Sequence, residues 1–193
     1  MKRLQTLALE QKEDARHGDA TFPIQKYITS LKPDYPVITT HWHEEAEFTL
    51  ITEGDANYQI DLTSYAVEKD DLIFIPPLLL HSVSRGQSAL YQSETYVFHM
   101  NFLGGNATDI CSTRYLMPLT NEELSVPCLI RPTIRLMYLC AKFLHRSVLS
   151  LQIRLRDTNW PLRHYCCRLF SCSCRTVPRT GNDLSTPQTP LKN

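Results

Sequence analysis

The sequence lacks any apolar run long enough to cross a membrane as a helix. Its first twenty residues also lack the apolar centre of a secretory signal peptide, because charges interrupt them from Glu10 onward. Cysteine is scarce in most of the chain, since two of the seven cysteines precede residue 134, and an odd number does not suit a disulfide scaffold. These absences predict a cytoplasmic protein with reduced thiols.

Acidic residues become scarce toward the C-terminal end, and glutamate is absent after Glu123. Residues 134–193 contain 10 Lys and Arg against 2 Asp and Glu, a net charge of +8, whereas residues 1–133 contain 10 against 18, a net charge of −8. Charge alone would not draw the first part to nucleic acid, but it could draw the second. The two parts therefore need separate explanations.

Short segments that alternate apolar and polar residues follow one another from residue 22 to residue 102. We expect them to be strands: FPIQKYITS, EFTLIT, NYQIDL, YAV, DLIFIPP, HSVS and TYVFHMNF. Turn-forming residues separate them, as at Gly54 and at Pro76-Pro77. Many short strands joined by such turns predict a mainly β fold, a sandwich or barrel, rather than βαβ units.

Histidine and glutamate gather in the stretch HWHEEAEFTLITEG, which begins at His41. Alternate side chains of a strand share a face, so His41, His43 and Glu47 can point to one side. A fourth ligand, His81, would come from a neighbouring strand. Three imidazoles and one carboxylate suit iron, manganese, zinc, nickel or copper, and leave positions open for a substrate. Glu45 shares the same parity and leaves the ligand count open.

The spacing H-x-H-x3-E-x6-G, filled by His41, His43, Glu47 and Gly54, resembles the first signature of the cupin superfamily. That resemblance implies a double-stranded β-helix, a jelly-roll barrel, in which His81 fills the fourth metal-ligand position. In effector-sensing cupins the same residues can instead be hydrogen-bonded parts of the barrel. Metal binding and a purely architectural role therefore stay open as alternatives.

A second cupin signature, G-x5-P-x-G-x2-H, is matched at Pro76 and His81. The sequence departs from it at Asp70 and Leu78, where the pattern has glycine, and Arg85 stands in place of the usual asparagine. These departures leave all four ligand positions filled.

A closer resemblance, over about residues 17–131, is to the N-terminal sensor domain of AraC-type transcription regulators. It rests on four segments in the right order: HGDATFPIQKYIT, THWHEEAEFTLITEGDANYQID, YAVEKDDLIFIPPLLLHSV and TRYLMPLTNEEL. In such regulators the barrel binds a small effector, often a sugar, and an N-terminal arm can fold over the pocket. Helices behind the barrel mediate dimerisation, and two helix-turn-helix motifs bind DNA.

We expect a flexible arm over residues 1–20, the barrel over residues 21–104, and a helix with an extended connection over residues 105–133. The basic, cysteine-rich tail over residues 134–193 has helical spacing over residues 134–157 and then too little apolar content to fold. It contains no helix-turn-helix pattern, so we expect the DNA-binding domain to be missing. A shifted reading frame and a genuine basic tail both account for its composition. Its cysteines lack the paired C-x2-C spacing of a zinc site.

The resemblance thus implies an effector-sensing and dimerisation domain of an AraC-type regulator, which binds a small molecule such as a sugar and forms a homodimer. DNA would be bound only through the missing domain, and no membrane is involved. The alternative is a stand-alone metal-dependent cupin enzyme of the sugar isomerase or dioxygenase type. No catalytic residue is assigned, and the one candidate cofactor is a divalent transition metal.

Two aromatic residues complete the candidate site, because aromatic rings can stack against a sugar ring, although most aromatic residues of a barrel belong to its core. The expected ligand-binding residues are His41, His43, Glu47, Tyr58, His81 and Tyr96. The expected metal ligands are His41, His43, Glu47 and His81.

Overall fold

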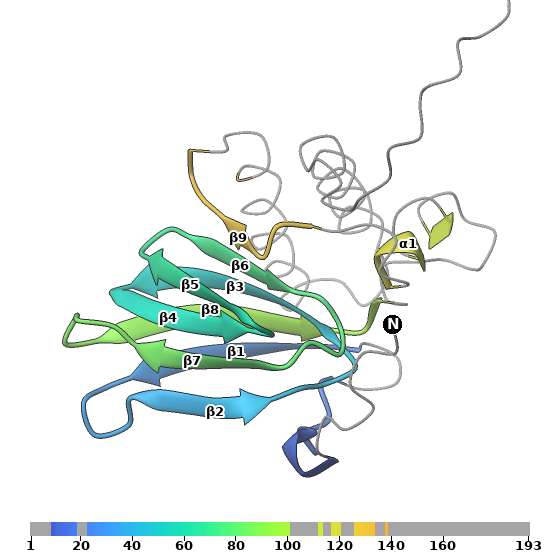
Figure 1. Ribbon diagram of the computed structural model, residues 1–193, viewed down its shortest axis with the longest axis horizontal. Helices are drawn as coiled ribbons and strands as arrows, with labels where there is room; N and C mark the ends of the chain where they lie inside the picture. The colour runs from blue at the N-terminus through green and yellow to red at the C-terminus, as the bar shows by residue number, and fades with distance from the viewer. Residues whose placement is uncertain are drawn as a thin grey trace, which may run out of the picture.

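The computed structural model describes residues 9–18, 23–100, 112–113, 117–120, 126–133 and 138 (Figure 1). The helix expected over residues 134–157 and the polar C-terminal end lie outside these residues, apart from residue 138. Within the described part, no helix is long and apolar enough to cross a membrane.

Nine strands of the described chain form two antiparallel sheets (Figure 1). The five-stranded sheet has the order β1 (Ile24–Leu31), β8 (Tyr91–Phe98), β3 (Ala46–Glu53), β6 (Leu72–Ile75) and β9 (Leu129–Ile130). The four-stranded sheet has the order β2 (Val37–His41), β7 (His81–Arg85), β4 (Asp55–Ile60) and β5 (Thr63–Glu68). A 3-10 turn, η1 (Leu9–Gln11), precedes the strands, and the short helix α1 (Met117–Thr120) follows β8. The predicted mainly β fold is confirmed.

The core lies between the two sheets, because its buried cluster draws side chains from both. The five-stranded sheet contributes Leu31, Ile51, Ile73, Ile75 and Tyr91, and the four-stranded sheet contributes Ala56, Tyr58, Ile60, Val67 and Val83. In β4 and β6 alternate side chains enter this core, as a strand with one face toward it requires.

Between β2 and β3 the chain passes from the four-stranded sheet to the five-stranded sheet through a bend, which the sequence did not predict. The spacing lets His41, His43 and Glu47 point to one side of a strand, but β2 ends at His41 and β3 begins at Ala46. His43 lies in the bend between them, and the two strands belong to different sheets. The residues still converge, because the bend turns His43 toward the space between the sheets.

The backbone shows why the cupin pattern has glycine at the two positions where this sequence departs from it. Asp70 and Leu78, which stand where the pattern has glycine, both have positive φ angles, 73° and 67°. This left-handed conformation is easy for glycine, tolerated by aspartate and costly for a branched side chain such as leucine. Gly54 also has a positive φ, 75°, and a Cβ there would lie 2.0 Å from the carbonyl oxygen of Leu90.

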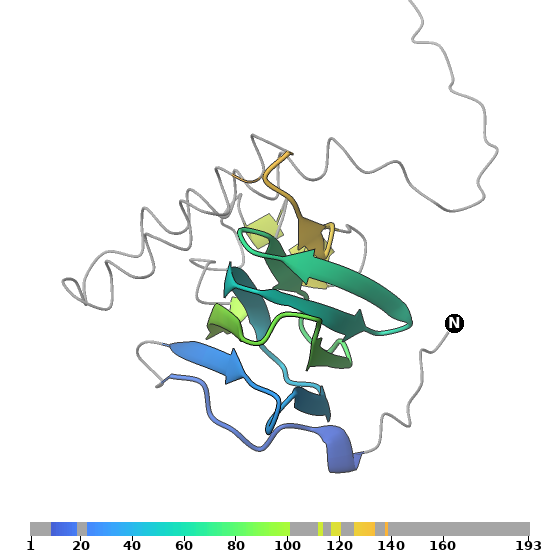
Figure 2. The same cartoon turned by 90° about the vertical axis from the view of Figure 1, so that its left-hand side faces the viewer.

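The described part of the N-terminal arm lies against the barrel beside β2, where η1 is seen in both Figure 1 and Figure 2. The backbone N–H of Glu13 donates to the carbonyl of Trp42 at 2.9 Å, and the N–H of Trp42 donates to the carbonyl of Gln11 at 3.1 Å. These bonds bring residues 13–17 to the edge of the space that holds the histidines.

Candidate metal centre

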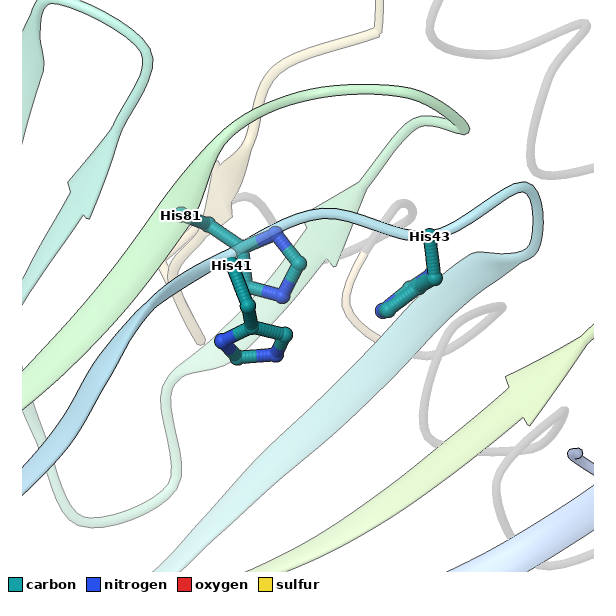
Figure 3. Close-up of side chains that lie close together, drawn as sticks. All are labelled: His41, His43 and His81. Carbon is teal, nitrogen blue, oxygen red and sulfur yellow. The ribbon is translucent and has the colours of Figure 1, made fainter. Parts of the chain in front are cut away.

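Three histidines from three different segments meet between the sheets (Figure 3). His41 ends β2 and pairs directly with His81, which begins β7. His43 comes from the bend before β3, and one ring nitrogen of each histidine lies within 4.8 Å of the other two. His43 and His81 are buried, and His41 is partly exposed.

Each of these histidines has one ring nitrogen fixed by a backbone carbonyl. The Nδ1 atom of His41 lies 2.8 Å from the carbonyl oxygen of Thr39, that of His43 lies 3.0 Å from Glu45, and that of His81 lies 2.8 Å from Leu79. A carbonyl oxygen can only accept a hydrogen bond, so Nδ1 carries the hydrogen in each ring.

The other ring nitrogen, Nε2, therefore carries a free lone pair when the ring is neutral. The Nε2 atoms of His43 and His81 are buried and have no hydrogen-bond partner. Buried polar atoms nearly always have partners, and metal-binding histidines characteristically donate their other N–H to a carbonyl or carboxylate. The arrangement is the one that metal binding requires.

Glu47 supplies the fourth group from the inner face of β3. Its Oε2 atom lies 3.6 Å from Nε2 of His43 and 3.7 Å from Nε2 of His81, while Thr49 donates a hydrogen bond of 2.7 Å to Oε1. Burial alone would raise the pKa of Glu47, but the side chains of His43, His81 and Thr49 around it outweigh burial and lower this pKa to about 2. Glu47 is therefore a carboxylate with one oxygen, Oε2, directed at the histidines.

The two buried histidines differ in their protonation. Burial disfavours the charged form of both, but in His43 the nearby carboxylate of Glu47, 3.6 Å from Nε2, prevails and the pKa is raised. In His81 burial prevails, with a contribution from the neighbouring His41, and the pKa is lowered. A proton thus favours the His43–Glu47 pair, whereas His81 is held neutral, the form that binds a metal.

These residues fit a divalent transition-metal ion: three imidazole nitrogens with fixed tautomers, one carboxylate, and two buried nitrogens without partners. Glu45, which left the ligand count open, lies on the other side of His43, with its Oε2 atom 3.9 Å from Nδ1. It therefore stands apart from the four candidate ligands.

A cavity of about 210 Å³ adjoins this centre. The candidate ligands form its polar end, and Ile28, Ile38, Val83 and Val97 contribute apolar walls. Among the described residues that line it, none is lysine or arginine. The volume and the lining suit a small molecule with few charged groups.

The two predicted aromatic residues have different positions. Tyr58 lines the cavity, and its hydroxyl is 2.8 Å from that of Tyr91. Burial raises the pKa of Tyr58 well above its usual value, so it remains a neutral phenol. Tyr96 does not line the cavity, because it pairs with Phe48 on the opposite face of the sheet from Thr95. The structure therefore corrects the expected place of Tyr96.

The cavity is also lined by Glu13, His17 and Tyr27, which the sequence analysis did not single out. Glu13 and His17 belong to the segment that the sequence assigned to a flexible arm. The spacing of these residues matches no known motif. The resemblance to regulators whose N-terminal arm folds over the pocket was the only sign that this segment could reach the cavity.

Residues 27–90 match the sequence family described as Cupin domain. The chain is also similar to a curated protein, the uncharacterized HTH-type transcriptional regulator YdeC of Bacillus subtilis (strain 168), with 34% identity over 71 residues. The aligned region is 36% of this chain and 24% of that protein, so the chain spans about a quarter of the regulator.

Similar solved structures include a cupin 2 conserved barrel domain protein from Rhodopseudomonas palustris, with 18% identity, a TM-score of 0.38, and coverage of 42% of this chain and 55% of that chain. A salicylate 1,2-dioxygenase from Pseudaminobacter salicylatoxidans has 15% identity, a TM-score of 0.37, and coverage of 39% and 22%. Residues 27–90 thus match the Cupin domain family in sequence and lie within an antiparallel two-sheet fold.

Proposed function

We propose that the barrel binds a small molecule beside a divalent transition-metal ion held by His41, His43, Glu47 and His81. The observation that carries this proposal is the pair of buried Nε2 atoms without partners, whose tautomers are fixed by backbone carbonyls. If these histidines served only the architecture of the barrel, their Nε2 atoms would be expected to have hydrogen-bond partners.

When bound, such an ion supplies a Lewis acid that polarises an oxygen of the ligand. The carboxylate of Glu47 neutralises part of the ionic charge, and Thr49 holds that carboxylate in place with its hydroxyl. The apolar walls keep water away, which strengthens electrostatic contacts at the polar end.

We further propose that this domain is the sensor of an AraC-type transcription regulator. The 34% identity to an HTH-type regulator supports a regulatory role, and the small, largely apolar cavity suits a low-molecular-weight effector. Effector binding would change the affinity for DNA through a DNA-binding domain, and a homodimer would match the symmetry of a DNA site. A sugar is one effector class within this proposal.

A second function, a metal-dependent cupin enzyme, is favoured by the same donor set, because four protein ligands leave positions open for a substrate. The two functions differ in the fate of the ligand. A sensor releases its ligand unchanged, whereas an enzyme returns a product.

The metal content of untagged protein, purified without chelator, tests the shared part of both functions. We expect a stoichiometric transition metal in the wild type and its loss in His43→Ala and Glu47→Gln. Glu45→Gln is the matched control, because its carboxylate faces the other ring nitrogen, and it should retain the metal. A wild type that neither retains nor takes up Zn²⁺, Mn²⁺, Fe²⁺, Ni²⁺ or Cu²⁺ would refute the proposal.

A ligand screen by thermal shift, with and without EDTA, then separates sensor from enzyme. Compounds that stabilise the metal-loaded protein are incubated with it and analysed by mass spectrometry. Recovery of the compound unchanged supports the sensor, and conversion at a rate that falls in Glu47→Gln supports the enzyme.

A further inference from the structure

A second carboxylate approaches the histidines from the N-terminal segment. The Oε2 atom of Glu13 lies 3.9 Å from Nε2 of His41 and 3.5 Å from Nε2 of His17. Two backbone hydrogen bonds to Trp42 hold this segment against the barrel. The position of Glu13 is therefore set by the fold and not by its own side chain alone.

The contact between Glu13 and a neutral His41 has no hydrogen atom to share between its two acceptor atoms. Nδ1 of His41 faces the carbonyl of Thr39 and carries the ring hydrogen, so a neutral His41 presents a lone pair to Glu13. Glu13 is a partly exposed glutamate and is ionised at neutral pH, so its carboxylate can only accept. Two acceptors face each other, and a cation between them would satisfy both.

A carboxylate oxygen also lies close to the other two histidines, because Oε2 of Glu47 is 3.6 Å from Nε2 of His43 and 3.7 Å from Nε2 of His81. Two carboxylates thus line the cavity beside the three imidazoles: Glu47 from β3 and Glu13 from the N-terminal segment. Together they would balance the charge of a divalent ion, whereas Glu47 alone would leave a net positive charge in a partly buried site.

His17 holds Glu13 in place from within the same segment. Its side chain is buried, with 6% of the residue exposed, and its Nε2 atom faces Oε2 of Glu13 at 3.5 Å. Its Nδ1 atom is 2.8 Å from the hydroxyl of Tyr27, and its ring lies edge-on to His43, with centroids 5.4 Å apart. A burial this complete in an N-terminal segment fixes His17 and Glu13 beside the metal ligands.

We infer that Glu13 is a second carboxylate ligand of the metal ion, so that the ion fastens residues 9–18 onto the mouth of the barrel. This inference rests on the proposed metal site. It makes the segment part of the site, and it links occupancy of the ion to the closure of the cavity on the side of the segment.

The test is Zn²⁺ affinity, measured by competition with a chromophoric chelator, in the wild type, Glu13→Gln and Glu10→Gln. Glu13→Gln keeps the shape of the side chain but removes its charge, and we expect it to weaken Zn²⁺ binding by about tenfold or more. Glu10→Gln is the matched control, because Glu10 is an exposed glutamate of the same segment and should bind Zn²⁺ as the wild type does.

Hydrogen–deuterium exchange gives a second readout that does not depend on affinity. Zn²⁺ should slow exchange at the amides of Glu13 and Trp42, which join the segment to the barrel, and this protection should be absent in Glu13→Gln. If Glu13 serves only as a partner of His17, Glu13→Gln lowers the melting temperature of the metal-free protein but leaves the Kd for Zn²⁺ and the exchange response unchanged. That result overturns the inference and leaves the metal site intact.

Failure of the metal site itself has a different signature. In that case the wild type binds no Zn²⁺, Glu13→Gln and Glu47→Gln are indistinguishable from it, and both the inference and the proposed function are overturned. If instead Glu47→Gln loses the ion and Glu13→Gln does not, the inference alone is overturned.

Discussion

His41 and His81 lie directly opposite each other on the paired strands β2 and β7, and the centroids of their rings are 4.3 Å apart. The register of these strands therefore sets the spacing of two candidate metal ligands. A shift of one residue would move one of the two side chains to the other face of the sheet. The barrel positions its site by strand pairing, and this makes the site sensitive to changes in the turns around it.

Protons should compete with the metal, because imidazoles must be neutral to bind it. The raised pKa of His43 places this competition at a higher pH than for an ordinary histidine, whereas the lowered pKa of His81 keeps that ring available. We expect the affinity for Zn²⁺ to fall as pH falls from 8 to 5, with more protons released on binding at pH 6 than at pH 8. Calorimetric titrations in buffers of different ionisation enthalpy measure this release, and an affinity independent of pH would contradict it.

Thr49→Val should weaken metal binding without removing a ligand. The substitution keeps the shape of the side chain but deletes the hydroxyl that donates to Oε1 of Glu47 at 2.7 Å. Loss of such a supporting bond typically costs about 10–100-fold in metal affinity. Competition with a chelator measures the change, and Thr63→Val, at an exposed position of β5, is the control. Equal affinity of Thr49→Val and the wild type would show that this bond does not support the site.

Leu78→Gly should stabilise the protein. Leu78 has a φ of 67° and is 52% exposed, so glycine would relieve the left-handed strain and lose little apolar burial. The strain is worth about 1–2 kcal/mol, partly offset by the greater freedom of glycine in the unfolded chain, which leaves a gain of about 0.5–1 kcal/mol. Urea unfolding measures it, and Leu78→Ala, which keeps the strain, is the control. A glycine variant no more stable than the alanine variant would contradict the account.

Gly54→Ala should destabilise the protein by about 3 kcal/mol, through strain at positive φ and overpacking. The added Cβ would lie 2.0 Å from the carbonyl oxygen of Leu90, a backbone atom that cannot move away without distorting the start of β8. Urea unfolding of the metal-free protein measures the loss. A change below about 0.5 kcal/mol, the range of ordinary surface substitutions, would show that the turn can shift.

The features of the fold that the sequence predicts are those that depend on short, local patterns of residues. The strands follow from alternation with a period of two residues, and the hydrophobic faces of β3 and β8 are visible in the sequence for that reason. The four candidate ligands could be chosen because a short spacing joins His41, His43 and Glu47, and a known signature adds His81. The structure brings all four together.

The remaining features depend on contacts between distant segments. Glu13 and His17 reach the cavity only because the segment pairs with Trp42, and no local pattern reports this pairing. Tyr96 was chosen for its ring, but its alternation with Thr95 and Val97 sends it to the opposite face of β8. Alternation along β8 excludes Tyr96 from the cavity once the residues of β8 that face inward are known.

The most direct test of the central claim is the X-ray absorption spectrum of the Zn²⁺-loaded wild type at the zinc edge. The account predicts a first shell of nitrogen and oxygen at about 2.0–2.2 Å with the outer-shell scattering of three imidazoles, reduced to two in His81→Ala. A shell of oxygen without imidazole scattering, or one that His81→Ala leaves unchanged, would contradict it.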